Sequence, residues 1–267
     1  MNDPMRPDDP NQPDDPNQPG DPNQPDGPTQ SSGTQRGEQA DPAGISTIDG
    51  LLLPTLTREA PKRLLVMLHG AGSSPGAIVS AAIAWQLKFR SAQALLLQAP
   101  HAGPDGQHYW VDPAEYPVNP ASIAAAADEA RARIESRQAA LGLPAKDTLV
   151  VGISQGASVA LEMTFADEPC AAITIGYAAR LYRVPAPDDR AAGQIHLLHG
   201  GADSVVPAVY GEIAYRRLRA AGAQVSLDLL PDEGHSVGQM LINRGTQHAM
   251  NWMFDRGEEA PPSGSAH

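Results

Sequence analysis

The feature that most constrains the fold of this chain is the pentapeptide Gly152-Ile153-Ser154-Gln155-Gly156. It follows the apolar run 148–151 and precedes the alanine-rich segment 157–166. A Gly-x-Ser-x-Gly motif between a strand and a helix is typical of a nucleophile elbow, a sharp turn that exposes the serine hydroxyl above the edge of a sheet. A side chain at either glycine would crowd the adjoining strand or helix. The sequence therefore predicts a strand–turn–helix unit with Ser154 at its apex.

Two later loops carry the groups that a serine nucleophile needs. A serine hydroxyl is activated by a histidine base, and a carboxylate orients that base. Asp203 follows the strand-like run 194–198, and His235 follows the strand-like run 224–230. Loops after the carboxyl ends of strands form sites in an open α/β sheet. We therefore expect Ser154, Asp203 and His235 to share one rim of the sheet.

Three other carboxylates compete with Asp203 for the position beside His235. Asp228 falls inside the predicted strand 224–230. Asp232 and Glu233 are so close to His235 in sequence that reaching the far nitrogen of its ring would need a tight turn. We interpret these two as solvated loop charges.

A loop upstream of the elbow has the composition of an oxyanion-binding loop. The apolar run 64–68 leads into His69-Gly70-Ala71-Gly72-Ser73, in which small residues dominate. Small residues allow backbone N–H groups to approach a developing oxyanion closely. The expected donors are the N–H of Ala71 in this loop and the N–H of Gln155 in the elbow.

Four segments together resemble one known family. Residues 68–72, 152–157, 195–203 and 233–235 are similar, in this order, to motifs of the phospholipase/carboxylesterase family, which also contains acyl-protein thioesterases. The resemblance spans about residues 64–252. It implies an α/β-hydrolase fold without a large cap domain, with Ser154 as nucleophile, Asp203 as acid and His235 as base. It also implies a serine carboxylesterase that acts on small-molecule esters of short to medium chain length, without a cofactor. Thioesters and lysophospholipids are the alternative substrates, and a non-catalytic binding module of the same fold is the alternative class.

Aromatic residues are scarce in the chain, so Tyr109 and Trp110 stand out in the loop that follows 94–98. They are interpreted either as an apolar wall for the acyl or alkyl group or as an anchor for a long loop. We assign both to the substrate pocket, together with Gly70 and Ser73 of the oxyanion loop.

The body of the chain alternates strand-like and helical segments, which indicates a mostly parallel sheet covered on both faces. Strands are expected at 64–68, 94–98, 148–152, 171–176, 194–198 and 224–230, and helices at 76–90, 121–141, 157–166, 207–221 and 238–254. Segments 45–48 and 51–53 are expected to add an edge hairpin.

The N-terminus has a different composition. A proline falls at every third position from Pro4 to Pro28, and aliphatic residues are absent between Pro7 and Pro28. Such a segment buries too little surface to fold. We therefore predict a disordered tail at 1–40, a catalytic domain at 41–256 and a flexible C-terminal tail at 257–267. The prolines are interpreted as a solvated spacer or as a polyproline ligand, and the flanks favour the spacer because they lack the usual basic residue.

Charge and composition limit the remaining functions. Residues 1–28 hold seven aspartates and one arginine, so they carry half of the formal net charge of −12. No basic patch is visible, so nucleic acid is not expected as a partner. We see neither a signal peptide nor a membrane span, which favours a cytoplasmic protein. No histidine pair has metal-ligand spacing, and Cys170 is expected to be a buried small hydrophobic residue. The oligomeric state is left open.

Overall fold

The computed structural model describes residues 50–115 and 117–255 of the 267 residues. The predicted tails at 1–40 and 257–267 and the predicted strand 45–48 lie outside the described residues, so those predictions stay predictions.

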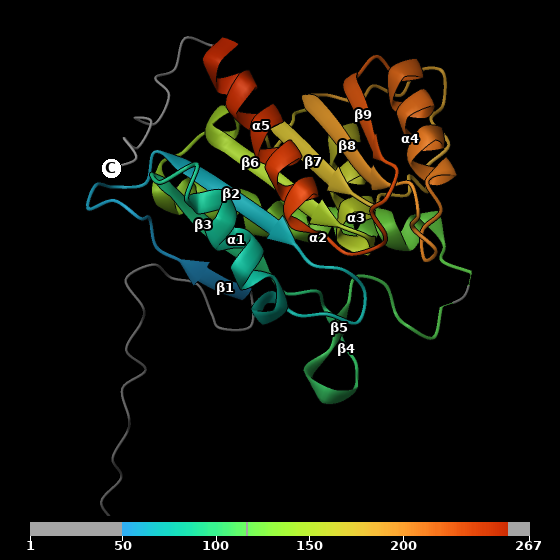
Figure 1. Cartoon of the computed structure of the whole chain (residues 1–267), viewed down its shortest axis with the longest axis horizontal. Coiled ribbons are helices and arrows are strands. Elements are labelled where there is room, and N and C mark those ends of the chain that lie inside the picture. Colours follow the sequence, from blue (N-terminus) through green and yellow to red (C-terminus); the bar gives the residue numbers. More distant parts are fainter. Residues whose placement is uncertain (1–49, 116, 256–267) are drawn as a thin grey trace, which may run out of the picture. The chain divides into compact units, whose positions relative to one another are not determined.

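Nine strands and five α-helices make up the described chain (Figure 1). The strands are β1 (Gly50–Leu53), β2 (Arg63–Leu68), β3 (Ala92–Leu97), β4 (His101–Ala102), β5 (His108–Tyr109), β6 (Thr148–Ile153), β7 (Ile173–Tyr177), β8 (Gln194–Gly200) and β9 (Gln224–Leu230). The helices are α1 (Val79–Gln86), α2 (Pro120–Leu141), α3 (Gln155–Glu162), α4 (Val209–Ala220) and α5 (Gln239–Asp255).

Seven strands form one sheet in the order β1-β3-β2-β6-β7-β8-β9. β1 pairs with β3 in antiparallel fashion, and every other neighbouring pair in this sheet is parallel. The register aligns Leu68 of β2 with Gly152 of β6, and Ile153 of β6 with Tyr177 of β7. The carboxyl ends of these central strands therefore meet at one edge, as the predicted fold class requires.

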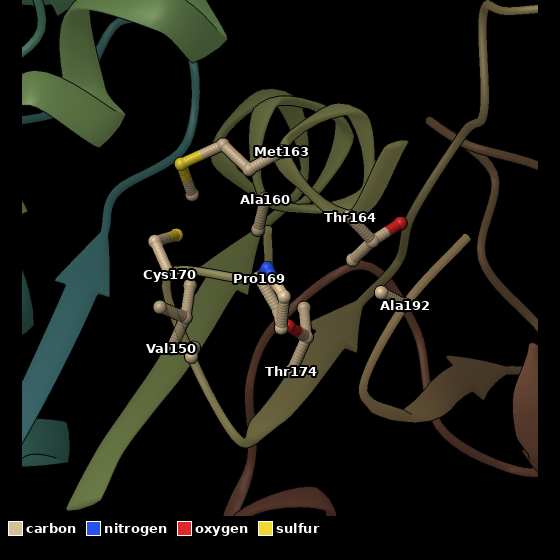
Figure 2. A pocket seen from close by; sticks show the side chains of 9 residues that line it. Val150, Ala160, Met163, Thr164, Pro169, Cys170, Thr174 and Ala192 are labelled. Atoms are coloured by element: carbon tan, nitrogen blue, oxygen red, sulfur yellow. The ribbon is translucent and has the colours of Figure 1, made fainter. Parts of the chain in front are cut away.

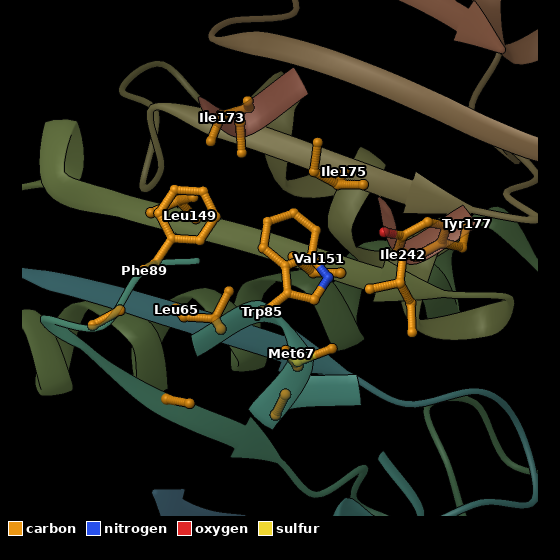
Figure 3. Packing of buried hydrophobic residues seen from close by; sticks show 14 of the residues in the cluster. Leu65, Met67, Trp85, Phe89, Leu149, Val151, Ile173, Ile175, Tyr177 and Ile242 are labelled. Carbon is orange, nitrogen blue, oxygen red and sulfur yellow. The ribbon is translucent and has the colours of Figure 1, made fainter. Parts of the chain in front are cut away.

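Helices cover both faces of the sheet, with α1 and α5 on one side and α2, α3 and α4 on the other (Figure 1). The alternation of side chains along β2 shows why both faces are buried. Leu65 and Met67 pack into the core beneath α1 and α5, where Trp85 lies among them (Figure 3). Leu64 and Val66 point into the second core, beneath α2 and α3. A strand that is apolar at every position is stable only in such a doubly covered sheet.

Helix ends follow local signals. The side chain of Asn119 accepts a hydrogen bond from the N–H of Ala121 at the start of α2, and Gly142 ends that helix in the left-handed conformation at φ 65°. α3 is shorter than the predicted helix 157–166, because the chain tightens into a 3-10 turn at Met163–Phe165. There the hydroxyl of Thr164 donates to the carbonyl of Leu161.

Two parts of the strand pattern differ from expectation. β1 is an edge strand that pairs with β3, which lies about forty residues later in the chain, and its expected hairpin partner 45–48 is not among the described residues. The short hairpin of β4 and β5 was not predicted. Each of its strands has only two residues, too few to show an alternating pattern.

Cys170 lies in the second core, as expected for a small apolar residue. It borders a small pocket of about 10 Å³ beside Met163 and Val150 (Figure 2). Such a volume has room for about one water molecule. Burial raises the pKa of the Cys170 thiol, so the side chain stays protonated and unreactive at neutral pH.

His196 is one of the two buried histidines of β8. Its Nδ1 lies 2.6 Å from the hydroxyl of Ser226 on β9, and its ring stacks on His248 of α5 with 4.1 Å between the ring centroids. His248 in turn is bound to the carboxylate of Asp228. Burial, together with the nearby His248, lowers the pKa of His196 from 6.5 to about 4, so its imidazole is neutral in the folded protein.

This buried imidazole should make the fold less stable in acid. The unfolded chain takes up a proton near pH 6.5, whereas the folded chain does so only near pH 4, so the free energy of unfolding falls as the pH drops between these values. Between pH 7 and pH 5 the loss through His196 is about 2 kcal/mol. Urea unfolding at the two pH values should show a loss about 2 kcal/mol smaller in His196→Gln than in the wild type. Equal losses in the two proteins would contradict this assignment.

Candidate active site

Ser154 occupies the turn between β6 and α3. Its backbone has φ 53° and ψ −115°, a conformation that residues other than glycine rarely adopt. The N–H of Ser154 donates to the carbonyl of Tyr177 at the end of β7, over 2.8 Å. The turn is therefore tied to the neighbouring strand and leaves the serine half-buried at the edge of the sheet.

The two glycines of the pentapeptide allow the elbow to pack closely. A Cβ atom at Gly152 would lie 2.5 Å from the Cα of Ala157 in α3. A Cβ atom at Gly156 would lie 2.5 Å from the carbonyl oxygen of His69, which follows β2. Only hydrogen atoms fit at these places, so the glycines set the position of Ser154 relative to β2.

Asp203 and His235 are brought together as a hydrogen-bonded pair. The Nδ1 atom of His235 lies 2.9 Å from Oδ2 of the buried Asp203. The other carboxylate oxygen accepts the N–H groups of Val205 and Val206, at 2.9 and 2.8 Å. Burial alone would raise the pKa of Asp203, but the hydrogen bonds from His235 and the two backbone groups outweigh it and lower the pKa. Asp203 is thus an ionised acceptor for the imidazole.

The loops after β8 and β9 contact each other through their backbones. The N–H of Gly201 donates to the carbonyl of Leu230 over 2.7 Å, and the N–H of Ala202 donates to the carbonyl of Glu233 over 3.0 Å. A Cβ atom at Gly200 would collide with the same Glu233 carbonyl. These contacts hold Asp203 next to His235, although 32 positions separate them in sequence.

The competing carboxylates lie elsewhere. Asp228 binds His248 of α5, with Arg244 at 3.6 Å. Asp232 is exposed, Glu233 is half-buried, and neither forms a hydrogen bond with His235. The geometry around the imidazole therefore favours Asp203.

A cavity of about 500 Å³ opens beside Ser154 and His235, both of which line it. The predicted oxyanion and pocket residues Gly70, Ala71 and Ser73 line it as well. Its apolar wall comes from α1, α5 and the adjoining loops: Ala77, Ile78, Ala81, Ala84, Ile153, Val237 and Ile242. The Ser154 hydroxyl and the His235 imidazole are not hydrogen-bonded to each other here, and such bonds commonly tighten only when substrate is bound.

The oxyanion loop runs alongside the serine. A Cβ atom at Gly70 would lie 3.5 Å from the Cβ of Ser154, so the backbone of the loop passes close to this serine. In residues 50–115 and 117–255, no acceptor takes the N–H of Ala71 or the N–H of Gln155. Both donors therefore remain available at the edge where Ser154 lies.

His69 fixes the start of this loop. Its Nε2 accepts the N–H of Ala99 at 3.2 Å, so the ring proton resides on Nδ1, which lies 2.8 Å from the carbonyl of Gly70. Burial lowers the pKa of His69, which keeps the ring neutral. The residue therefore shapes the turn after β2.

Trp110 is an anchor that joins the elbow to the oxyanion loop. It is almost fully buried, its indole N–H donates to the carbonyl of His69 at 2.8 Å, and its backbone N–H donates to Oε1 of Gln155 at 2.8 Å. The hydroxyl of Tyr109 bonds to Gln107 and lies against Gly72 of the oxyanion loop. Neither aromatic residue lines the cavity beside Ser154. Sequence reasoning missed the link to Gln155, because it joins residues 45 positions apart.

Within the described ranges, no group of three or more His, Cys, Asp and Glu side chains is arranged to hold a metal ion. In the same ranges, no helix is both long and apolar enough to cross a bilayer.

The mostly parallel sheet, the helices on both faces and the serine elbow define an α/β-hydrolase. The sequence model of the phospholipase/carboxylesterase family matches residues 56–252, and the chain belongs to that family.

The chain is also similar to individual esterases and to their solved structures. A segment of 110 residues is 34% identical to Esterase YpfH of Escherichia coli, and it covers 41% of this chain and 45% of that protein, so the match spans less than half of the relative. The crystal structure of esterase PE8 has a TM-score of 0.67 and 26% identity, and the match covers 76% of this chain and 98% of that one. The carboxylesterase of Bacillus cereus shares the fold, with a TM-score of 0.63 and 14% identity over 74% of this chain and 91% of its own.

The packing at the elbow predicts that Gly156→Ala destabilises the protein. The added methyl group would push against the backbone carbonyls of Leu68 and His69, which cannot rotate away as a side chain would. The expected loss in the free energy of unfolding is about 1–3 kcal/mol, measured by urea denaturation. Gly76→Ala is the control, because its new Cβ would have no contact closer than 3.7 Å. Equal stabilities for Gly156→Ala and Gly76→Ala would contradict the close approach.

Proposed function

We propose that this protein is a serine carboxylesterase that hydrolyses short- to medium-chain carboxylic esters through an acyl-enzyme. The observation that carries the proposal is the 2.9 Å hydrogen bond between His235 and the buried Asp203, beside a cavity that Ser154 also lines. The similarity to esterases over part or most of their length supports the same reaction.

The proposed reaction begins when Ser154 Oγ attacks the acyl carbonyl carbon and its proton passes to Nε2 of His235. Asp203 accepts a hydrogen bond from the Nδ1–H group of His235, which leaves Nε2 as the basic nitrogen and stabilises the imidazolium once it forms. The imidazolium then gives its proton to the departing alcohol as the acyl–oxygen bond breaks. Water attacks the acyl-enzyme with the same histidine as base, and the carboxylic acid leaves.

The N–H groups of Ala71 and Gln155 are the proposed donors to the oxyanion of each tetrahedral intermediate. Both are backbone groups on segments fixed by buried contacts, so they need little rearrangement as the charge develops. Trp110 supports this role, because it binds the carbonyl of His69 on one segment and the side chain of Gln155 on the other.

The shape of the cavity supports the proposed range of acyl chains. Its volume of about 500 Å³ is in the range of small-molecule sites, and its wall contains Ile78, Ile153 and Ile242. This apolar wall fits a short or medium alkyl chain, while Ser154 and His235 lie at its polar side. We therefore propose that the acyl group of the ester occupies this cavity.

The nucleophile assignment predicts that a fluorophosphonate probe labels Ser154. Ser154→Ala should abolish both labelling and ester hydrolysis, because the attacking oxygen is absent, and it should leave the circular dichroism spectrum unchanged. Peptide mapping by mass spectrometry locates the label, and Ser158→Ala serves as the matched control, since Ser158 lies one turn further along α3 and is buried. Labelling on another residue, or full turnover by Ser154→Ala, would overturn the assignment.

The acid assignment predicts that Asp203→Asn lowers kcat by about 10⁴, the size of effect known for the corresponding change in a serine protease. The amide would hold His235 in the wrong tautomer and would no longer stabilise the imidazolium. Asp232→Asn and Glu233→Gln are the controls, and each should cost less than about tenfold, since neither carboxylate binds the ring. The three values of kcat are compared at one neutral pH. If kcat fell by about 10⁴ in one of the two control variants and not in Asp203→Asn, Asp203 would not be the acid.

A further inference from the structure

Arg180, on the loop that follows β7, lies against two aromatic rings, one from the same loop and one from α4. The guanidinium carbon of Arg180 lies 4.5 Å from the ring centroid of Tyr182 and also 4.5 Å from that of Tyr210. Arg180 is exposed, and no carboxylate in the described part of the chain forms an ion pair with it. We call Arg180, Tyr182 and Tyr210 the arginine clamp.

The neighbouring arginines are used to hold this loop in place. Arg183 binds the buried carboxylate of Glu162 at the end of α3, with 2.7 Å between its Nε and the nearer oxygen. Arg217 of α4 donates to the backbone carbonyls of Leu181 and Arg183, both at 3.1 Å. The segment just after Arg180 is therefore fixed, while no carboxylate among the described residues forms an ion pair with Arg180 itself.

The arginine clamp joins the loop that follows β7 to the first turn of α4. Tyr177, whose carbonyl accepts the N–H of Ser154, precedes Arg180 by three residues, which span at most about 11 Å. Tyr210 lies in the first turn of α4, seven residues after Asp203. In the sequence between Asp203 and Tyr210, Val205 and Val209 have exposures of 67% and 49%. Both parts of the arginine clamp therefore follow closely after groups of the candidate site, Arg180 after the strand end that binds Ser154 and Tyr210 after Asp203.

The chemistry of the arginine clamp suits an anion. Aromatic rings attract a cation to their faces. The side chain of Tyr182 also forms a hydrogen bond with Arg180, but a guanidinium has five N–H donors, so others are left for a ligand. The edge of a guanidinium matches the two oxygens of a carboxylate or a phosphate. The formal net charge of the chain is −12, so its overall field repels anions, and binding one requires a local cation held in place.

We propose that Arg180 binds an anionic group, a carboxylate or a phosphate, on the part of the ester substrate that extends beyond the cavity. The proposal rests on the proposed esterase function and narrows its substrates to acidic esters. Arg180 is then the residue that sets specificity, and Tyr182 and Tyr210 position it.

The kinetic test compares one neutral ester with two anionic esters. 4-Nitrophenyl butyrate is neutral, 4-nitrophenyl hydrogen glutarate carries a carboxylate on the acyl side, and 4-carboxyphenyl butyrate carries one on the alcohol side. For at least one anionic ester, the ratio of its kcat/KM to that of the neutral ester should fall about tenfold in Arg180→Gln, the size expected for one charge-assisted hydrogen-bond pair at an exposed site.

Arg190→Gln is the matched control, because it removes the same charge from the same loop, and its ratios should stay within about twofold of the wild type. Unchanged ratios in Arg180→Gln, or an equal fall in Arg190→Gln, would overturn the proposal.

A binding test separates this proposal from the esterase proposal. Wild-type protein that hydrolyses none of the three esters would contradict the esterase function. Anion binding to the arginine clamp is then measured in the Ser154→Ala protein, through the NMR signal of the Arg180 Nε–H group. This signal is assigned by its absence from the spectrum when Arg180→Gln is added to the same protein. A saturable shift on addition of glutarate supports a carboxylate ligand, and a shift on addition of inorganic phosphate alone supports a phosphate ligand. No shift with either anion at millimolar concentration would overturn the proposal.

Discussion

The left-handed backbone of Ser154 is the constraint around which the rest of the site is arranged. A positive φ at a serine costs about 1–3 kcal/mol and persists only when its surroundings impose it. Here the surroundings are a buried strand, a helix packed through two glycines, and a hydrogen bond to the end of β7. The cores on both faces of β6 hold these elements in place, so the stability of the whole sheet maintains one strained turn.

Much of the fold can be predicted from the sequence, because the parallel strands are buried on both faces. Five of the six predicted parallel runs are mostly apolar and almost fully buried, whereas the sixth forms the partly exposed edge strand β9. All six appear as strands within about two residues of their expected ends. The β4–β5 hairpin and the pairing of β1 depend on contacts between distant segments, which no local pattern encodes. The length of α3 depends on one hydroxyl, that of Thr164, which propensity does not reveal.

The candidate site could likewise be predicted only in part. Chain order places Asp203 and His235 in loops after neighbouring strands, and the structure puts their side chains in contact. What the sequence could not give is the path of the loop through Tyr109 and Trp110, because an aromatic pair is equally suited to a pocket wall and to an anchor. Hydrogen bonds decide that question for Trp110, since both of its N–H groups bind acceptors on other segments. The contact of Arg180 with Tyr210 could not be predicted either, because it joins a loop to a helix thirty positions further along the chain.

The anchoring of Trp110 bears on how such a protein can diverge. The base of the β4–β5 hairpin is fastened to the elbow and the oxyanion loop, whereas its tip around Asp105 is exposed and its hydrogen bonds stay within the hairpin. Insertions or deletions at the tip would therefore leave Ser154 and the loop after β2 where they are. Related proteins can thus vary the length of this hairpin while the geometry of the candidate site stays the same.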